Sequence, residues 1–266
     1  MAINDPGNYN LLKVQKPKIN NQFNAFLFSI KALTIMRIIE VNGRFNLGLF
    51  FSALRPLLLV FIVGVFIRGY DPTFTAQEAF QSVLFCGAVF FFWREIAIGF
   101  GFLDSRKNIL YLPNTSHIAL VLSCFLSALF IFIPIFFLCF LIFFFLDINI
   151  DIFRIFEAIL YASILGFCFI LPISFFCFNN NIIQQFVAYI PLIALFTSCV
   201  FYPLKSIPLE TQPIFLLNPL VHIVEIVRSA VFPEEDFSYI DVKYILSFSS
   251  CLLLLSPFGY ISNIKK

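Results

Sequence analysis

Long runs of apolar residues, separated by short polar segments, make up most of this 266-residue chain. A helix that crosses a bilayer needs about 20 predominantly apolar residues. The segments that satisfy this criterion are residues 47–67, 79–102, 118–146, 155–178, 184–204 and 240–262. The pattern therefore predicts an all-α membrane protein whose transmembrane domain, residues 47–266, has six transmembrane helices.

Two segments precede this domain. Residues 1–25 are polar, carry several lysines and are predicted to form a cytoplasmic tail. Residues 26–46 are apolar but are interrupted by four charged side chains: Lys31, Arg37, Glu40 and Arg44. This mixture is typical of an amphipathic helix that lies in the membrane interface rather than crossing it. An ordinary juxtamembrane segment is the alternative.

A shorter helix is predicted at residues 219–231, before the last span. Asn218 can cap it, Pro219 suits its first turn, and Pro233 ends it. Helical spacing places four polar side chains along one stripe of an otherwise apolar surface: His222, Glu225, Arg228 and Ser229. Because this helix is too short to cross a bilayer and too apolar for water, we expect it to be re-entrant or interfacial. At the outer mouth its stripe would face water or an exit path, with a role in gating or as a plain anchor.

Composition and charge agree with a membrane location. Hydrophobic residues make up 61% of the chain and charged residues only 12%, whereas roughly a quarter of a soluble domain is charged. Lysine and arginine are enriched in cytoplasmic loops. With both termini in the cytoplasm, ten of the 17 lysines and arginines lie on the cytoplasmic side and five lie outside, so we predict this orientation. The distribution shows no basic patch for nucleic acid.

Few residues could carry chemistry. Arg94 and Glu95 lie in the second predicted span, where ionisable groups usually face the bundle interior, a partner chain or a water-filled path. Neighbouring residues on a helix do not face each other, so the two need different partners. Arg94, beside the single tryptophan Trp93, is a candidate for the path of an anionic substrate. Pairing between helices is the alternative.

Neither catalysis nor cofactor binding is predicted. The chain has no phosphate-binding loop of the form G-x-x-x-x-G-K-[ST], so it is not expected to hydrolyse ATP by itself. Its two histidines, His117 and His222, are expected on opposite sides of the membrane, without neighbouring metal ligands.

Four stretches resemble the membrane subunits of ABC-2 type exporters, and most closely the capsular polysaccharide export permeases. They are Met36 to Gly48 with the following Leu54-Arg-Pro-Leu57, the region of Arg94, Ser198-Cys-Val-Phe-Tyr-Pro-Leu-Lys-Ser-Ile-Pro208, and Leu217-Asn-Pro-Leu-Val-His-Ile-Val-Glu-Ile-Val-Arg-Ser-Ala230. The resemblance covers nearly the whole chain. Arg55 is a departure, because the family usually has Glu before the proline of the first span.

The resemblance implies a permease of a bacterial inner membrane that works as a homodimer with two separately encoded ABC ATPase subunits, which bind ATP and Mg. A lipid-linked, anionic polysaccharide would pass between the two permease chains and reach envelope export proteins. The interfacial helix and the inner loops would dock on the ATPases, and the candidate docking residues are Arg37, Glu40, Arg44, Arg106, Lys107 and Asn108.

Two other functions are the alternatives to a capsular polysaccharide exporter. An ABC-2 exporter of O-antigen, teichoic acid, a drug or a lipid would have the same architecture. A membrane-embedded enzyme acting on lipid-linked substrates would need ionisable groups that converge at one depth, and the sequence offers no such cluster.

Overall fold

The computed structural model describes residues 22–42, 54, 58, 62, 76–99, 116–145, 149–177, 181–233 and 237–257. Its elements are α1 (Gln22–Asn42), α3 (Ala76–Ala97), α5 (His117–Phe145), α6 (Ile152–Cys177), α7 (Asn181–Thr197), the 3-10 turn η2 (Leu204–Ser206), α8 (Gln212–Leu216), α9 (Pro219–Val231) and α10 (Val242–Leu254). These described residues contain no strand, which confirms the predicted all-α class.

Five of the six predicted spans overlap helices, namely α3, α5, α6, α7 and α10. The first predicted span, residues 47–67, lies outside the described residues except for three helical positions: Leu54, Leu58 and Ile62. Among the described helices, α5 and residues Ile152–Phe176 of α6 are long and apolar enough to cross a membrane, while α7 and α10 contain shorter apolar segments. Six membrane crossings therefore stay a prediction.

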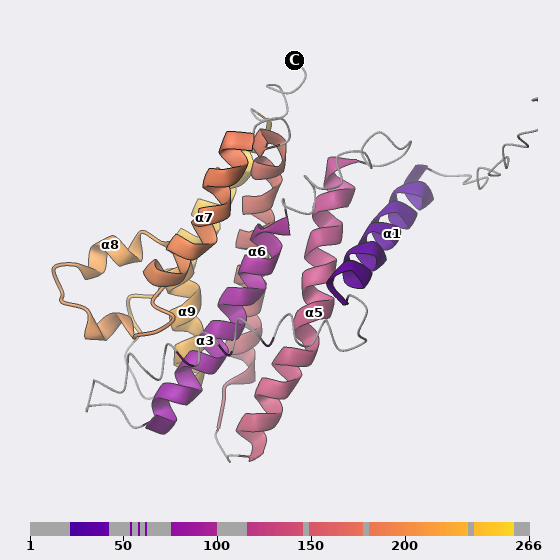
Figure 1. Ribbon diagram of the computed structural model, residues 1–266. Coiled ribbons are helices and arrows are strands. Elements are labelled where there is room, and N and C mark those ends of the chain that lie inside the picture. Colours follow the sequence, from indigo (N-terminus) through magenta and orange to yellow (C-terminus); the bar gives the residue numbers. More distant parts are fainter. Residues whose placement is uncertain are drawn as a thin grey trace, which may run out of the picture.

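Helix α7 ends at Thr197, before the predicted boundary at residue 204. The backbone changes direction there, because Cys199 has a φ of 58°, in the left-handed region that side-chain-bearing residues rarely adopt. A right-handed helix cannot continue through such a residue. The chain that follows, with η2 and α8, projects sideways from the bundle (Figure 1).

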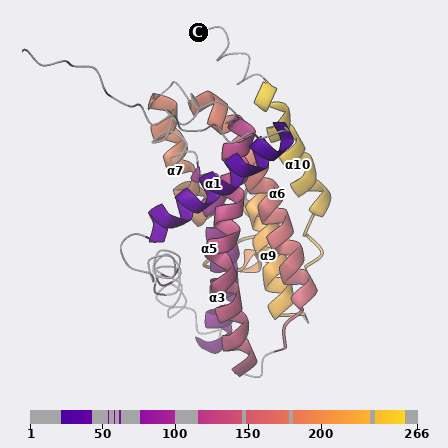
Figure 2. The same cartoon turned by 90° about the vertical axis from the view of Figure 1, so that its right-hand side faces the viewer.

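Helix α6 lies at the centre of the bundle and packs against α3, α5, α7, α9 and α10. Figure 1 shows α3, α5 and α6 side by side along the long axis. Helix α9 occupies the half of the bundle that contains the α5–α6 connection, and α10 occupies the other half (Figure 2). A backbone hydrogen bond of 3.0 Å from Asp151 N to Ala230 O fixes the end of α9 at the start of α6. Helix α9 therefore ends near the α5–α6 connection, whereas α10 lies in the other half of the bundle.

The three long helices approach closely at glycines. A Cβ atom on Gly99, just beyond α3, would lie 2.9 Å from the Cβ of Cys124 and 2.8 Å from Cδ1 of Ile170. A Cβ on Gly166 of α6 would lie 3.1 Å from Ile96 of α3. Glycine at these two positions therefore allows α3 to lie against both α5 and α6.

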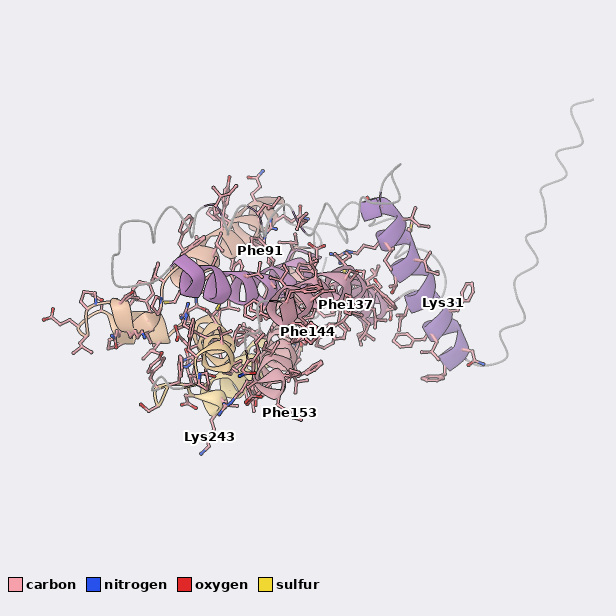
Figure 3. The ribbon with its side chains drawn as sticks, turned by 90° about the horizontal axis from the view of Figure 1, so that it is seen from below. Lys31, Phe91, Phe137, Phe144, Phe153 and Lys243 are labelled. Carbon is pink, nitrogen blue, oxygen red and sulfur yellow. The ribbon has the colours of Figure 1, made fainter. Side chains whose placement is uncertain are left out.

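Bulky apolar side chains cover the outside of the bundle. On α5 they recur at helical spacing on one face: Phe130, Ile133, Phe137, Leu141 and Phe144. Figure 3 shows Phe137 and Phe144 of α5 and Phe153 of α6 on the outside, and these residues are 68%, 78% and 87% exposed. Such a surface is unfavourable in water, so these faces meet lipid or another protein chain.

Helix α1 crosses α5 obliquely instead of running along it (Figure 2). Its buried face consists of Ala25, Ile30, Leu33, Thr34 and Arg37. Its exposed face is largely apolar, with Phe23, Leu27, Phe28, Ile35 and Ile39 beside Lys31 (Figure 3). The predicted helix at residues 26–46 therefore exists with bounds four residues earlier, at Gln22–Asn42.

Candidate functional site

Helix α9 begins and ends where the sequence predicts. The Asn218 side chain accepts a hydrogen bond from Leu220 N at 3.1 Å, and Pro219 occupies the first turn. Asn218 Nδ2 also donates to Thr197 Oγ1 at 3.0 Å. The cap residue that starts α9 therefore also ties it to the last residue of α7.

Three of the four side chains in the polar stripe of α9, all but the partly buried Ser229, do not face water, and this part of the prediction is wrong. His222, Glu225 and Arg228 are only 4%, 0% and 2% exposed. The connection that follows α7 and the segment that leads into α10 both fold over the stripe and bind it through hydrogen bonds. The three side chains form an internal polar network, which we call the α9 network.

Arg228 binds the turn that follows α7. Its Nη1 pairs with Glu225 Oε1, one helical turn earlier. Its Nη2 donates to the carbonyl oxygens of Cys199, at 2.8 Å, and Tyr202, at 3.3 Å. Because a guanidinium carries five N–H donors in a rigid plane, one arginine can hold the carboxylate and both carbonyls. The left-handed turn at Cys199 is thereby fixed from α9.

Glu225 binds both the segment after α7 and the segment before α10. Its Oε1 accepts from Leu204 N at 3.1 Å, and its Oε2 accepts from the Tyr239 hydroxyl at 2.8 Å. With Arg228, the fully buried carboxylate thus has three donors. A buried charge is tolerated only when it is paired and hydrogen-bonded in this way.

His222 forms a third connection. Its Nε2 lies 3.0 Å from Leu216 O, and Asp241 N donates to its Nδ1 at 3.2 Å. A carbonyl only accepts and a backbone amide only donates, so the ring is neutral with its hydrogen on Nε2. Burial lowers the pKa of His222, which favours this neutral form. Beside the ring, Tyr244 Oη donates to Leu217 O at 2.6 Å.

Together these bonds join the turn after α7, the end of α8, helix α9 and the start of α10 into one unit. Sequence reasoning missed the partners of the stripe because most of them are backbone groups, which leave no trace in the residue pattern. Among the described residues, no three His, Cys, Asp or Glu side chains are grouped to hold a metal ion.

A second ion pair, between buried Arg37 and half-buried Glu95, joins α1 to α3. Arg37 Nη2 lies 3.0 Å from Glu95 Oε1 and 3.1 Å from the Glu95 backbone oxygen. Arg37 is only 4% exposed. The prediction that Arg94 and Glu95 have different partners is confirmed. Arg37, a candidate for ATPase docking, belongs to the buried face of α1 and binds within the chain.

Trp93 and Arg94 occupy different environments on α3. Trp93 is buried, with ring centres of Phe90 and Phe169 each 5.7 Å away, and its Nε1 has no hydrogen-bond partner in the part of the chain that the structure describes. Arg94 is half-buried, and its guanidinium carbon lies 5.5 Å from the centre of the Phe91 ring.

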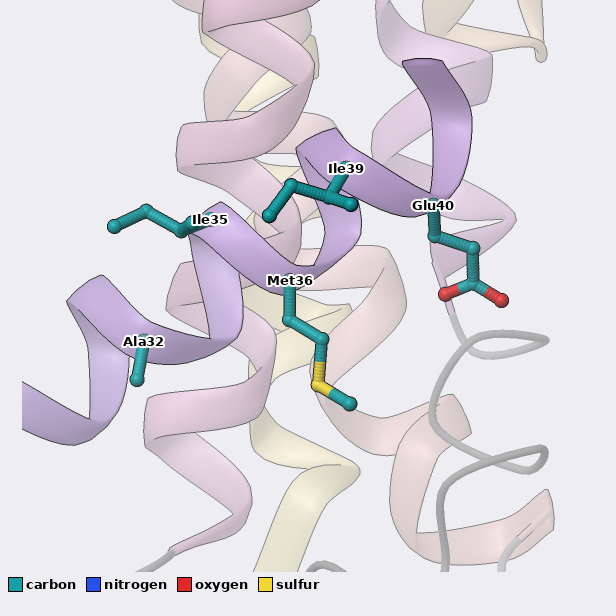
Figure 4. A pocket seen from close by; sticks show the side chains of 5 residues that line it. All are labelled: Ala32, Ile35, Met36, Ile39 and Glu40. Atoms are coloured by element: carbon teal, nitrogen blue, oxygen red, sulfur yellow. The ribbon is translucent and has the colours of Figure 1, made fainter. Parts of the chain in front are cut away.

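Glu40 lies on the exposed face of α1, as a docking residue requires. Together with Ala32, Ile35, Met36 and Ile39 it lines a shallow hollow along the helix (Figure 4). The remaining candidates fall outside the described residues: Arg44, Arg106, Lys107 and Asn108, and likewise Arg55 of the first span.

Fold and site together define a helical, multi-pass membrane protein with two ion pairs, Arg37–Glu95 and Glu225–Arg228, inside the described part of the bundle. No family model matches the chain. Two Escherichia coli proteins, each named polysialic acid transport protein KpsM, are similar to it. One is 25% identical over 238 residues, covering 85% of this chain and 90% of the relative. The other is 24% identical over 236 residues with the same coverage. This confirms the resemblance to capsular polysaccharide export permeases that the motifs indicated.

Proposed function

We propose that this chain is the membrane subunit of an ATP-driven exporter that moves a lipid-linked capsular polysaccharide across the inner membrane. The observation that carries the proposal is the similarity to polysialic acid transport proteins over nearly the full length of both chains. Two of the four motifs that suggested the resemblance, residues 198–208 and 217–230, meet in the α9 network, where Glu225, Arg228 and the 198–204 turn bind one another.

ATP hydrolysis belongs to a separate subunit in this proposal. The sequence supports this division because it has no phosphate-binding loop. Two copies of the chain would work with two ABC ATPase subunits and pass the polysaccharide to envelope export proteins, with both termini in the cytoplasm. The exposed apolar faces of α5 and α6 agree with lipid or a second copy as neighbours.

Arg94 and Trp93 are our candidates for the substrate path. Three other described arginines, Arg37, Arg154 and Arg228, each pair with a carboxylate. Arg94 has no carboxylate partner among the described residues, and it is half-buried. A guanidinium in this setting suits a passing anion such as a carboxylated sugar or a lipid phosphate.

Deletion of the gene in the source organism tests the proposal. We expect capsular polysaccharide to disappear from the cell surface and lipid-linked chains to collect inside the cell, with both changes reversed by re-expression. The purified chain should hydrolyse no ATP above background, and it should copurify with an ABC ATPase. Unchanged surface polysaccharide, with a different compound retained inside, would refute the assigned substrate.

A further inference from the structure

We propose that the Arg37–Glu95 ion pair is the joint through which movement of α1 reaches α9, with α3 as the rigid body between them. The proposal rests on the proposed function, in which α1 docks on the ATPase. Arg37 and Glu95 are positioning residues in this role, because they act through helices and contact no substrate.

At the α1 end, the attachment to α3 is narrow and polar. Helix α1 packs chiefly against α5, through apolar side chains such as Ile30 and Leu33. Arg37 reaches further and binds both the carboxylate and the backbone oxygen of Glu95. Two charge-assisted hydrogen bonds to one residue fix the direction and the distance of Arg37 relative to α3.

Helix α3 is suited to carry a displacement along its length. The other long helices of the bundle contain an internal proline, namely Pro134 in α5, Pro172 in α6 and Pro191 in α7, whereas α3 contains none. Proline removes a helical hydrogen bond and is a usual place for a helix to bend. An unbroken helix moves as one body when it is pulled near its end.

The far part of α3 packs against α9. Cys86 Sγ lies 3.7 Å from the backbone oxygen of Val224, the residue before Glu225. From Cys86 to Glu95 the helix rises by roughly 13 Å. A shift of α3 would therefore act on α9 beside the ion pair of the α9 network, and through it on the turn at Cys199.

The chain offers a matched control. Arg154 and Glu157 form an ion pair within α6, at 3.7 Å, and their side chains are 51% and 33% exposed. Both residues belong to the same helix, so the pair does not connect α6 to another helix. Removing it eliminates an arginine–glutamate pair of the same kind but leaves the Arg37–Glu95 joint intact. Arg37→Ala and Glu95→Gln should uncouple the complex, while Arg154→Ala should not.

The first measurement uses the complete complex of this chain with its ATPase, reconstituted in lipid. We expect Arg37→Ala and Glu95→Gln to lower the polysaccharide transported per ATP hydrolysed by about tenfold, with ATPase binding and protein level unchanged. The charge-exchanged double variant, Arg37→Glu with Glu95→Arg, should recover part of the loss. Wild-type transport per ATP in the single variants would overturn the proposal. A loss that only follows the amount of folded protein would overturn it too, since the pair would then be a plain anchor.

A second measurement needs no substrate, so it separates this proposal from the proposed function. Leu209, in the connection between η2 and α8, is 82% exposed and can carry a labelled cysteine in a background with Cys177→Ser and Cys251→Ser. We expect ATP to change the labelling rate at residue 209 in the wild-type complex and in Arg154→Ala, and not in Arg37→Ala. A labelling rate that does not change with ATP in the wild type, or that still changes with ATP in Arg37→Ala, would overturn the proposed joint. This holds even if export of polysaccharide is confirmed.

Discussion

Replacing Arg228 with methionine should destabilise the part of the bundle around α9 more than most single substitutions do. Methionine keeps the length and the apolar stem of the side chain but removes the guanidinium. The Glu225 carboxylate, which is 0% exposed, then keeps only two uncharged donors, Leu204 N and the Tyr239 hydroxyl. Removing one partner of a buried ion pair costs about 3–5 kcal/mol, because the other charge stays buried without compensation.

The size of the effect distinguishes the structure from the expectation based on sequence alone. An exposed pair three residues apart on a helix contributes only about 0.2–0.5 kcal/mol. Arg154→Met, which breaks the exposed pair with Glu157, should therefore cost at most about 1 kcal/mol. Removing both buried charges, with Glu225→Leu and Arg228→Met together, should cost less than Arg228→Met alone, since no unpaired charge remains.

Denaturant titration of the purified full chain in detergent measures these differences in the free energy of unfolding. The carbonyls of Cys199 and Tyr202 also lose a donor in Arg228→Met, so the turn after α7 should become sensitive to protease before the rest of the chain. A loss of stability in Arg228→Met no larger than in Arg154→Met would refute the reasoning, because the α9 network would then not depend on its ion pair.

Three further predictions concern other parts of the bundle. Burial lowers the pKa of His222 in the folded chain, so the unfolded chain takes up the proton first as the pH falls below about 6.5. The free energy of unfolding should therefore decrease with falling pH. His222→Gln should flatten this dependence in a pH series of melting curves. Gly99→Ala places a Cβ within 3 Å of both Cys124 and Ile170 and should cost about 1–3 kcal/mol in the same unfolding assay. Arg94→Ala should lower export in cells without lowering the melting temperature, and an equal loss of both would show that Arg94 is structural.

The sequence by itself determined the features that depend on neighbouring residues. The bounds of α9 follow from Asn218 and Pro219, whose effects are confined to one turn of helix. The all-α class and the positions of the long helices follow from apolar runs, because the length of a run does not depend on what packs against it. Adjacent residues on a helix point in different directions, so the separate partners of Arg94 and Glu95 could also be predicted.

The tertiary structure alone decided where polar side chains point and what they bind. A polar stripe on an apolar helix is equally consistent with a surface and with a buried network, and the choice depended on a turn more than twenty residues away in the chain, at Cys199 to Leu204. From the sequence alone, Arg37 is expected on the protein surface. In the structure it binds Glu95, 58 residues later. Contacts across such separations depend on how whole helices pack, and hydrogen bonds to backbone groups leave no pattern in the residues, so neither could be derived from the sequence.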